Sequence, residues 1–193
     1  DRELKKALEA HWKGELYEAG LRAVGQRLRA EHWQLQKDAG IDLLPVGDFA
    51  WYDQVLAHSL AFGVIPERFR PTAGKPTLDT LFAMARGAVA NKSSGNCCDG
   101  AHAQELTKWF DTNYHYLVPE FGVDQQFALS WEQLFEEVAE ARALGHNVKP
   151  VLIGPLTYLW LGKVKGGDFD KLELLESLLP VYGEIFQRLA AQG

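Results

Sequence analysis

Cysteine is scarce in this chain, because its 193 residues contain only two, the adjacent Cys97 and Cys98. A small disulfide-stabilised domain needs several spaced cysteines, so that class is excluded and a reducing cytoplasm is favoured. Positive charge is scarce as well, since 20 Lys and Arg stand against 26 Asp and Glu, which gives a net charge of −6. Proteins that bind nucleic acid usually carry a basic surplus, so we expect no nucleic-acid partner.

Long apolar runs are missing too. The stretch 151–161 has about half of the roughly 20 residues that a membrane span needs, and Gly154 and Pro155 interrupt it. The first six residues are mostly charged, unlike the start of a secretory signal peptide. With 47% hydrophobic and 24% charged residues, the composition is that of a folded globular protein. We therefore expect a soluble cytoplasmic protein with no membrane partner.

The common catalytic and nucleotide-binding signatures are absent from the sequence. It contains no G-x-G-x-x-G, no G-x-x-x-x-G-K, no H-E-x-x-H and no G-x-S-x-G. Cys97 and Cys98 lack the C-x-x-C spacing that lets two thiolates reach one zinc ion. We therefore predict no catalytic residue and no metal ligand within this chain.

The hydrophobic periodicity favours long helices separated by short apolar strands. Gly, Asn and Ser dominate residues 87–102, which predicts a flexible loop. Asp48 ends the first strand, where it could face a ligand site at the strand ends, as Thr157 and Asn113 would, or cap the next helix, which is the commoner role. The expected helices are 3–12, 15–39, 51–62, 78–86, 130–144 and 170–191, with a helical turn at 104–108, and the expected strands are 41–48, 110–118 and 148–153.

Helices that alternate with short apolar strands are typical of parallel βαβ units, so the expected fold class is α/β. Periodicity leaves a doubly wound sheet and a (β/α)8 barrel equally open. Three strands are too few to complete either fold, the chain lacks an initiator Met, and its last helix stops as it reaches Gly193. We therefore expect a piece of a longer protein.

One candidate binding stretch opens the chain with three cations, Arg2, Lys5 and Lys6, around Glu3 and Leu4. The positive end of a helix dipole disfavours clustered cations. An anionic ligand would suit the same place, because free helix N–H groups and basic side chains converge there. A solvated polar face remains the alternative.

The second candidate stretch runs from Lys108 to Tyr116. Trp, Phe, two Tyr and a His interleave there with Lys, Asp, Thr and Asn, including Asn113. A ligand cleft uses rings for stacking and polar groups for direction, whereas buried polar atoms in a core need partners. From composition alone, a binding site and ordinary core packing remain equally open.

Four stretches resemble the N-terminal half of cobalamin-independent methionine synthase. The resemblance covers nearly the whole chain, but not residues 87–102, where the family varies in length. The stretches are 2–9 (RELKKALE), 42–53 (DLLPVGDFAWYD), 108–116 (KWFDTNYHY) with 119–121 (PEF), and 149–163 (KPVLIGPLTYLWLGK).

The resemblance implies that residues 1–193 are an incomplete N-terminal (β/α)8 barrel of a two-barrel enzyme. Such enzymes transfer a methyl group from 5-methyltetrahydropteroyltriglutamate to homocysteine and so make methionine. Their C-terminal barrel carries the zinc and binds homocysteine, so zinc and that barrel would both lie outside this chain. The resemblance assigns the folate polyglutamate to Arg2, Glu3, Leu4, Lys5, Lys108 and Asn113, with Glu3 and Leu4 contributing backbone or packing.

Two other interpretations of the sequence remain. The chain could be a non-catalytic scaffold or binding module, or part of another (β/α)8-barrel zinc methyltransferase or a uroporphyrinogen-decarboxylase-like barrel. A downstream barrel with one His, two Cys and an acid as zinc ligands would distinguish the synthase from the scaffold.

Overall fold

The structure is a computed structural model that describes residues 2–88 and 100–193. The chain divides into two compact units. Unit 1 contains Asp1–Phe49 and Glu136–Val151, and unit 2 contains Ala50–Phe135 and Leu152–Gly193. Within the described residues, no helix is both long and apolar enough to span a bilayer.

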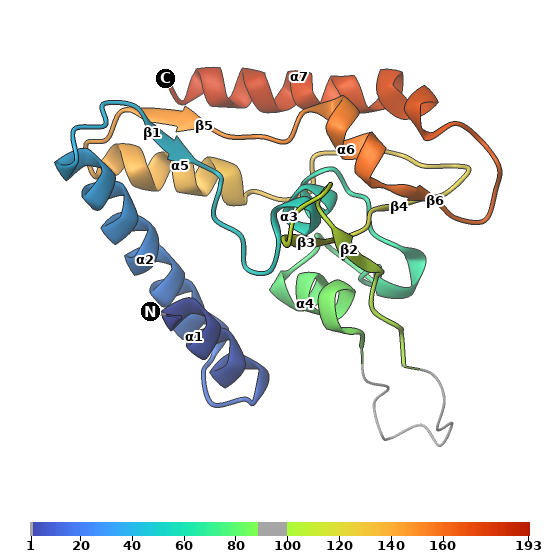
Figure 1. The fold of residues 1–193 in the computed structure, drawn as a ribbon, viewed down its shortest axis with the longest axis horizontal. Coiled ribbons are helices and arrows are strands. Elements are labelled where there is room, and N and C mark those ends of the chain that lie inside the picture. The colour runs from blue at the N-terminus through green and yellow to red at the C-terminus, as the bar shows by residue number, and fades with distance from the viewer. Residues whose placement is uncertain (1, 89–99) are drawn as a thin grey trace. The chain divides into compact units, whose positions relative to one another are not determined.

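Unit 1 is built from α1 (Glu3–Trp12), α2 (Glu18–Asp38), most of α5 (Gln133–Ala143) and a parallel strand pair. The pair joins β1 (Leu44–Val46) to β5 (Val148–Pro150), with Leu44 opposite Val148. Trp33 of α2 donates its indole N–H to the carbonyl of Pro45 at 3.1 Å. Because this bond joins the helix to the strand that follows it, the α2–β1 connection has a defined geometry (Figure 1).

A nearly buried ion cluster joins α2 to α5 in unit 1. Arg29 lies 2.7 Å from Glu140 and 3.7 Å from Glu137, and its guanidinium lies 4.8 Å from the centre of the Phe49 ring. Carboxylates removed from water need such a partner, because an unpaired buried charge is strongly destabilising. The cluster therefore fixes how α5 packs on α2.

Unit 2 combines helices with two short strand pairs (Figure 1). β2 (Leu106–Lys108) and β3 (His115–Leu117) form an antiparallel hairpin, and β4 (Glu120–Phe121) pairs in parallel with β6 (Lys163–Val164). The helices of this unit are α3 (Gln54–Ala61), η1 (Glu67–Phe69), α4 (Leu78–Arg86), α6 (Pro155–Leu161), η2 (Lys171–Leu174) and α7 (Leu175–Ala191).

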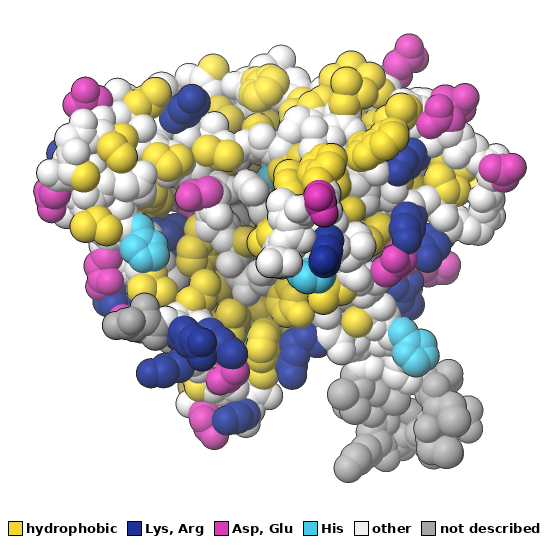
Figure 2. All heavy atoms as spheres, viewed as in Figure 1, with side chains coloured by type: hydrophobic (Ala, Val, Ile, Leu, Met, Phe, Trp, Pro, Cys, Tyr) yellow, Lys and Arg dark blue, Asp and Glu magenta, His cyan; other side chains and the backbone are white. Residues whose placement is uncertain are grey.

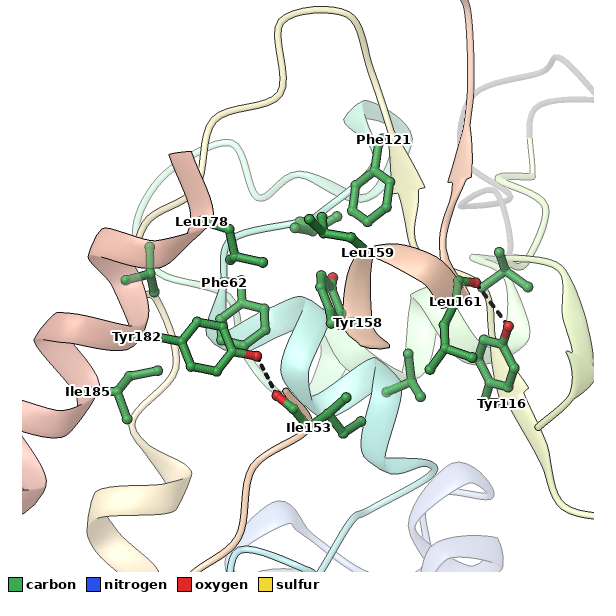
Figure 3. Packing of buried hydrophobic residues seen from close by; sticks show 14 of the residues in the cluster. Phe62, Tyr116, Phe121, Ile153, Tyr158, Leu159, Leu161, Leu178, Tyr182 and Ile185 are labelled. Atoms are coloured by element: carbon green, nitrogen blue, oxygen red, sulfur yellow. Dashed lines mark hydrogen bonds between the residues drawn. The ribbon is translucent and has the colours of Figure 1, made fainter. Parts of the chain in front are cut away.

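The core of unit 2 is rich in aromatic rings (Figure 3). Phe62 and Tyr158 are fully buried and meet edge to face, with their ring centroids 4.9 Å apart. Phe121 packs against Tyr158 at 5.9 Å, and the Tyr182 hydroxyl donates to the carbonyl of Ile153. Edge-to-face packing buries the apolar surface of the rings and brings their quadrupoles into a favourable orientation. These contacts therefore hold α3, α6 and α7 together.

The structure shows a mixed α/β fold with parallel strand pairs, as the sequence predicted, but three local predictions were wrong. Residues 110–118 do not form one strand of a parallel sheet, because β3 pairs antiparallel with residues 106–108. Those residues form β2 rather than the expected helical turn. The short helix α6 was not expected, although Pro155 occupies its first turn, which suits a residue without an N–H.

Four of the six predicted helices have different bounds in the structure, where they are α2, α3, α5 and α7. Asp53, not Asp48, caps α3, so that helix begins at Gln54 instead of at Trp51. The predicted helix 170–191 begins as the 3-10 helix η2, and α7 follows from Leu175 with Pro180 in its interior. Helices 3–12 and 78–86 have the predicted bounds.

The flexible loop predicted at 87–102 lies largely outside the described residues, and so do Cys97 and Cys98. At its edges, Ala88 and Ala101 form an antiparallel bridge.

His58 of α3 is buried and neutral because both of its ring nitrogens are used. Nε2 accepts the N–H of Ile153 at 3.0 Å, so Nδ1 carries the proton and donates to the carbonyl of Gln54 at 2.8 Å. Burial lowers the pKa of His58 to about 4, against the opposing effect of the Gln54 bond. The side chain thus joins α3 to the segment before α6.

We expect the stabilising effect of His58 to be complete above about pH 6.5 and to disappear as the pH falls towards 4. Because the unfolded state binds the proton first, wild type should lose about 2 kcal/mol relative to His58→Gln between pH 7 and pH 5. Urea denaturation at both values measures this difference. His32→Gln, at an exposed histidine, is the control. A constant difference between wild type and His58→Gln would contradict the neutral buried imidazole.

Candidate functional site

The first candidate stretch lies at the start of α1 in unit 1. Arg2, Glu3 and Lys5 are exposed and Leu4 is half-buried. Arg2 precedes the helix with a φ of 63°, and its carbonyl accepts the N–H of Lys6 at 3.0 Å. Figure 2 shows Lys and Arg side chains gathered at the lower left, where Figure 1 places α1. Cationic side chains and the first helical N–H groups therefore lie at one end of α1.

The charged residues of this first stretch differ in their ion pairs. The Glu3 carboxylate is bound by Arg27 of α2, and this hydrogen bond holds its pKa below the ordinary value. Lys5 is 3.8 Å from Glu9, but 64% of its side chain remains exposed. An exposed ion pair of this kind contributes little to stability, so Lys5 can exchange Glu9 for another carboxylate. The Glu3 carboxylate instead bridges α1 to Arg27 of α2.

The second candidate stretch forms the hairpin of β2 and β3 in unit 2. Lys108 ends β2 opposite His115, and both side chains are exposed. Asn113 is exposed in the turn, and its carbonyl lies 2.9 Å from Nδ1 of His115. Within the described residues, no carboxylate lies within 4 Å of the Lys108 ammonium group. Lys108 therefore offers a cation without a carboxylate partner in the described part of the chain, on the same hairpin as Asn113.

The turn of this hairpin is held by its own polar groups. The Trp109 N–H donates to the carbonyl of Tyr114 at 2.7 Å, and the Thr112 hydroxyl donates to the carbonyl of Trp109 at 2.6 Å. The same hydroxyl accepts the N–H of Tyr114 at 3.2 Å. Phe110 lies within this turn with a φ of 48°, a left-handed conformation that costs an ordinary residue about 1 to 2 kcal/mol.

Two bonds attach the hairpin to α3. Leu117 of β3 donates its N–H to Asp53 at 3.1 Å, and Gln54 donates its N–H to the Tyr114 hydroxyl at 3.3 Å. Asp53 also accepts the N–H of Leu56 at 2.8 Å, which caps the helix. Burial raises the pKa of Asp53 to about 6, although these backbone donors oppose the shift. The rigid start of α3 thus sets the position of Lys108 and Asn113.

Sequence patterns did not predict the residues that support the second stretch. Asp53 had a detectable signal, since an Asp directly before Gln54 and an apolar run is a common helix cap. The left-handed Phe110 had no signal, because aromatic residues rarely adopt that conformation. Among the described residues, the non-glycine residues with clearly positive φ are Arg2 and Phe110. Each belongs to one of the two predicted stretches, and backbone strain is often retained at functional sites.

A groove of about 620 Å³ lies between α2 and α5 in unit 1. Its lining is mainly small and apolar, and the Oε1 atom of Glu140 is buried there with no hydrogen-bond partner among the described residues. None of the predicted site residues lines it. The lining residues are Ala23, Gln26, Arg27, Ala30, Glu136, Glu140, Ala143 and Leu144.

Comparison with known proteins identifies the family. The sequence model described as "Cobalamin-independent synthase, N-terminal domain" matches residues 1–193, which is the whole chain. The chain belongs to this family. One relative is the 5-methyltetrahydropteroyltriglutamate–homocysteine methyltransferase of Proteus mirabilis (strain HI4320), which is 58% identical over 193 residues. The match covers 100% of this chain and 25% of the relative, so the chain spans about a quarter of that protein's length.

Membership of the cobalamin-independent synthase family agrees with the resemblance seen in the sequence. It also gives the two candidate stretches a common context, because both lie within the single domain that the family model covers. The readings as an unrelated scaffold or as a different zinc methyltransferase are not favoured by the 58% identity to a named methyltransferase.

Proposed function

We propose that this chain is the N-terminal, folate-binding part of a longer methyltransferase. That enzyme transfers a methyl group from 5-methyltetrahydropteroyltriglutamate to homocysteine and produces methionine. The main support is the family match over all 193 residues, together with 58% identity to a methyltransferase of this kind.

The role proposed for this chain is to hold the glutamate tail of the methyl donor. The tail presents several carboxylates, and Lys and Arg bind carboxylates through charge-assisted hydrogen bonds. Arg2 and Lys5 are exposed at the start of α1, and Lys108 and Asn113 are exposed on the hairpin. The exposed amide of Asn113 can donate to a carboxylate as well. Glu3 and Leu4 would contribute backbone and packing.

We further propose that the two parallel strand pairs belong to a (β/α)8 barrel. The pairing of β1 with β5 supports this, because the intervening chain contains helices that make a parallel crossover possible. The remaining strands would come from residues outside this chain.

A second, C-terminal barrel of the same protein is the proposed partner. The proposed location is the cytoplasm, because two adjacent cysteines without a disulfide framework suit a reducing compartment.

Zinc is implied by the family, and the described part of the chain holds no group of side chains that fits it. Within residues 2–88 and 100–193, no three His, Cys, Asp or Glu side chains are grouped as metal ligands. Cys97 and Cys98 lie outside the described residues, and adjacent cysteines lack the usual zinc spacing. We therefore assign zinc and homocysteine to the rest of the protein, where zinc would keep the homocysteine sulfur as a thiolate.

Assays of the full-length protein and of the 193-residue chain test this division of roles. The full-length protein should form methionine from the triglutamate donor and homocysteine, whereas the isolated chain should show no turnover, because thiolate activation lies elsewhere. The isolated chain should also contain no stoichiometric zinc. Turnover by the chain alone, or a full-length protein inactive with zinc and both substrates, would refute the proposal.

A further inference from the structure

We propose that Phe110 stacks on the aminobenzoyl ring of the methyl donor, so that the hairpin binds a ring as well as carboxylates. This inference rests on the proposed function, and it names a contact with a part of the donor other than the glutamate tail. It starts from the conformation and exposure of one side chain.

Phe110 is an exposed ring on a strained backbone. The residue is 57% exposed, although a phenyl ring gains by burial, and its φ of 48° is one that phenylalanine rarely adopts. A core residue would bury the ring and a simple turn would use Gly or Asn at this φ. Neither role explains Phe110, whereas a contact with a ligand explains both the ring and its exposure.

The hairpin presents this ring in a fixed position. Trp109 is half-buried against the core of unit 2, and its ring meets that of Phe110 nearly at right angles, with centroids 5.4 Å apart. Thr112 closes the turn through hydrogen bonds to Trp109 and Tyr114, and Tyr114 is joined to α3. A side chain that is already held in place loses little freedom when a ligand binds, which favours a binding role.

The hairpin carries a cation two residues from the ring of Phe110, and the donor carries a carboxylate close to its aminobenzoyl ring. In a pteroylglutamate, the aminobenzoyl carbonyl forms an amide with the first glutamate, so a flat ring lies close to a carboxylate. Phe110 follows the unpaired cation Lys108 by two residues, and Asn113 completes the turn. A ring and a cation on one hairpin are complementary to a ligand of this form, because the ring and the first carboxylate are close together in the donor.

The test uses the full-length protein with Phe110→Asn and Phe110→Tyr. Asn tolerates the left-handed conformation but has no ring, and Tyr retains the ring. Phe110→Asn should raise the KM by about 2- to 10-fold, and by the same factor for mono- and triglutamate donors, because both contain the aminobenzoyl group. Phe110→Tyr should restore the wild-type KM, and kcat at saturating donor should stay unchanged.

Phe186→Ala is the matched control, because Phe186 on α7 is also 57% exposed and should leave both KM values unchanged. If wild type is active and Phe110→Asn leaves both KM values unchanged, the stacking contact is wrong while the proposed function stands. A rise for the triglutamate donor alone would also refute it, since the ring would then act on the tail. If wild type transfers no methyl group from either donor, the proposed function itself has failed.

Discussion

Replacing both Lys5 and Lys108 by Ala in the full-length protein should raise the KM for the triglutamate donor by at least about 100-fold. Each lysine is expected to make a charge-assisted contact with a tail carboxylate, worth about 1.5 to 3 kcal/mol where water is excluded. In the free protein Lys5 has one exposed pair, with Glu9 at 3.8 Å, so its removal should cost little stability. Initial-rate measurements at varied donor concentration provide the KM.

Three comparisons distinguish a tail contact from a general charge effect. The rise in KM should be smaller for a monoglutamate donor, which lacks the outer carboxylates. It should be smaller again at high salt, which screens the ion pairs. Lys13→Ala removes the same charge from the exposed end of α1 and should leave KM unchanged. Homocysteine binding and zinc content should be unaffected by the lysine changes.

Two outcomes would contradict the assignment of the lysines. An equal rise in KM for both donors would indicate that these lysines contact the pteridine end or act in folding. No change with either donor would leave them as parts of a solvated surface.

Tyr158→Ala should destabilise unit 2 by about 3 to 5 kcal/mol, the usual cost of deleting a large ring from a packed core. Tyr158 is fully buried on α6, meets Phe62 and Phe121 edge to face, and has its hydroxyl 2.9 Å from that of Ser59. Burial also raises the pKa of this phenol, so the hydroxyl stays protonated. Urea denaturation followed by fluorescence measures the free energy of unfolding.

Two variants separate the ring from the hydroxyl and from the helix. Tyr158→Phe keeps the ring and should cost only about 1 kcal/mol, because Ser59 still donates to the carbonyl of Val55. Leu156→Ala, at a residue of the same helix that is 56% exposed, should change stability by no more than about 0.5 kcal/mol. Equal effects of Tyr158→Ala and Leu156→Ala would show that the aromatic core does not stabilise this unit.

The sequence predicted the features that local patterns encode. The helices 3–12 and 78–86 have the expected bounds because their apolar residues repeat at helical spacing. The buried residues of β1 and the parallel strand β5 were expected from short apolar runs that end in Gly or Pro. The family resemblance rested on ordered stretches of sequence, and the family match over the whole chain confirms it.

Only the tertiary structure decided which strands pair and how the candidate residues are held. Residues 106–108 form a strand because they meet β3, and a three-residue strand is too short for periodicity to show. Asp53 contacts Leu117 across 64 positions, and His58 contacts Ile153 across 95. Such bonds depend on a partner that lies far away in the sequence, so local propensity contains no information about them. The left-handed backbone of Phe110 likewise follows from the closure of its hairpin by Thr112, and not from any preference of phenylalanine.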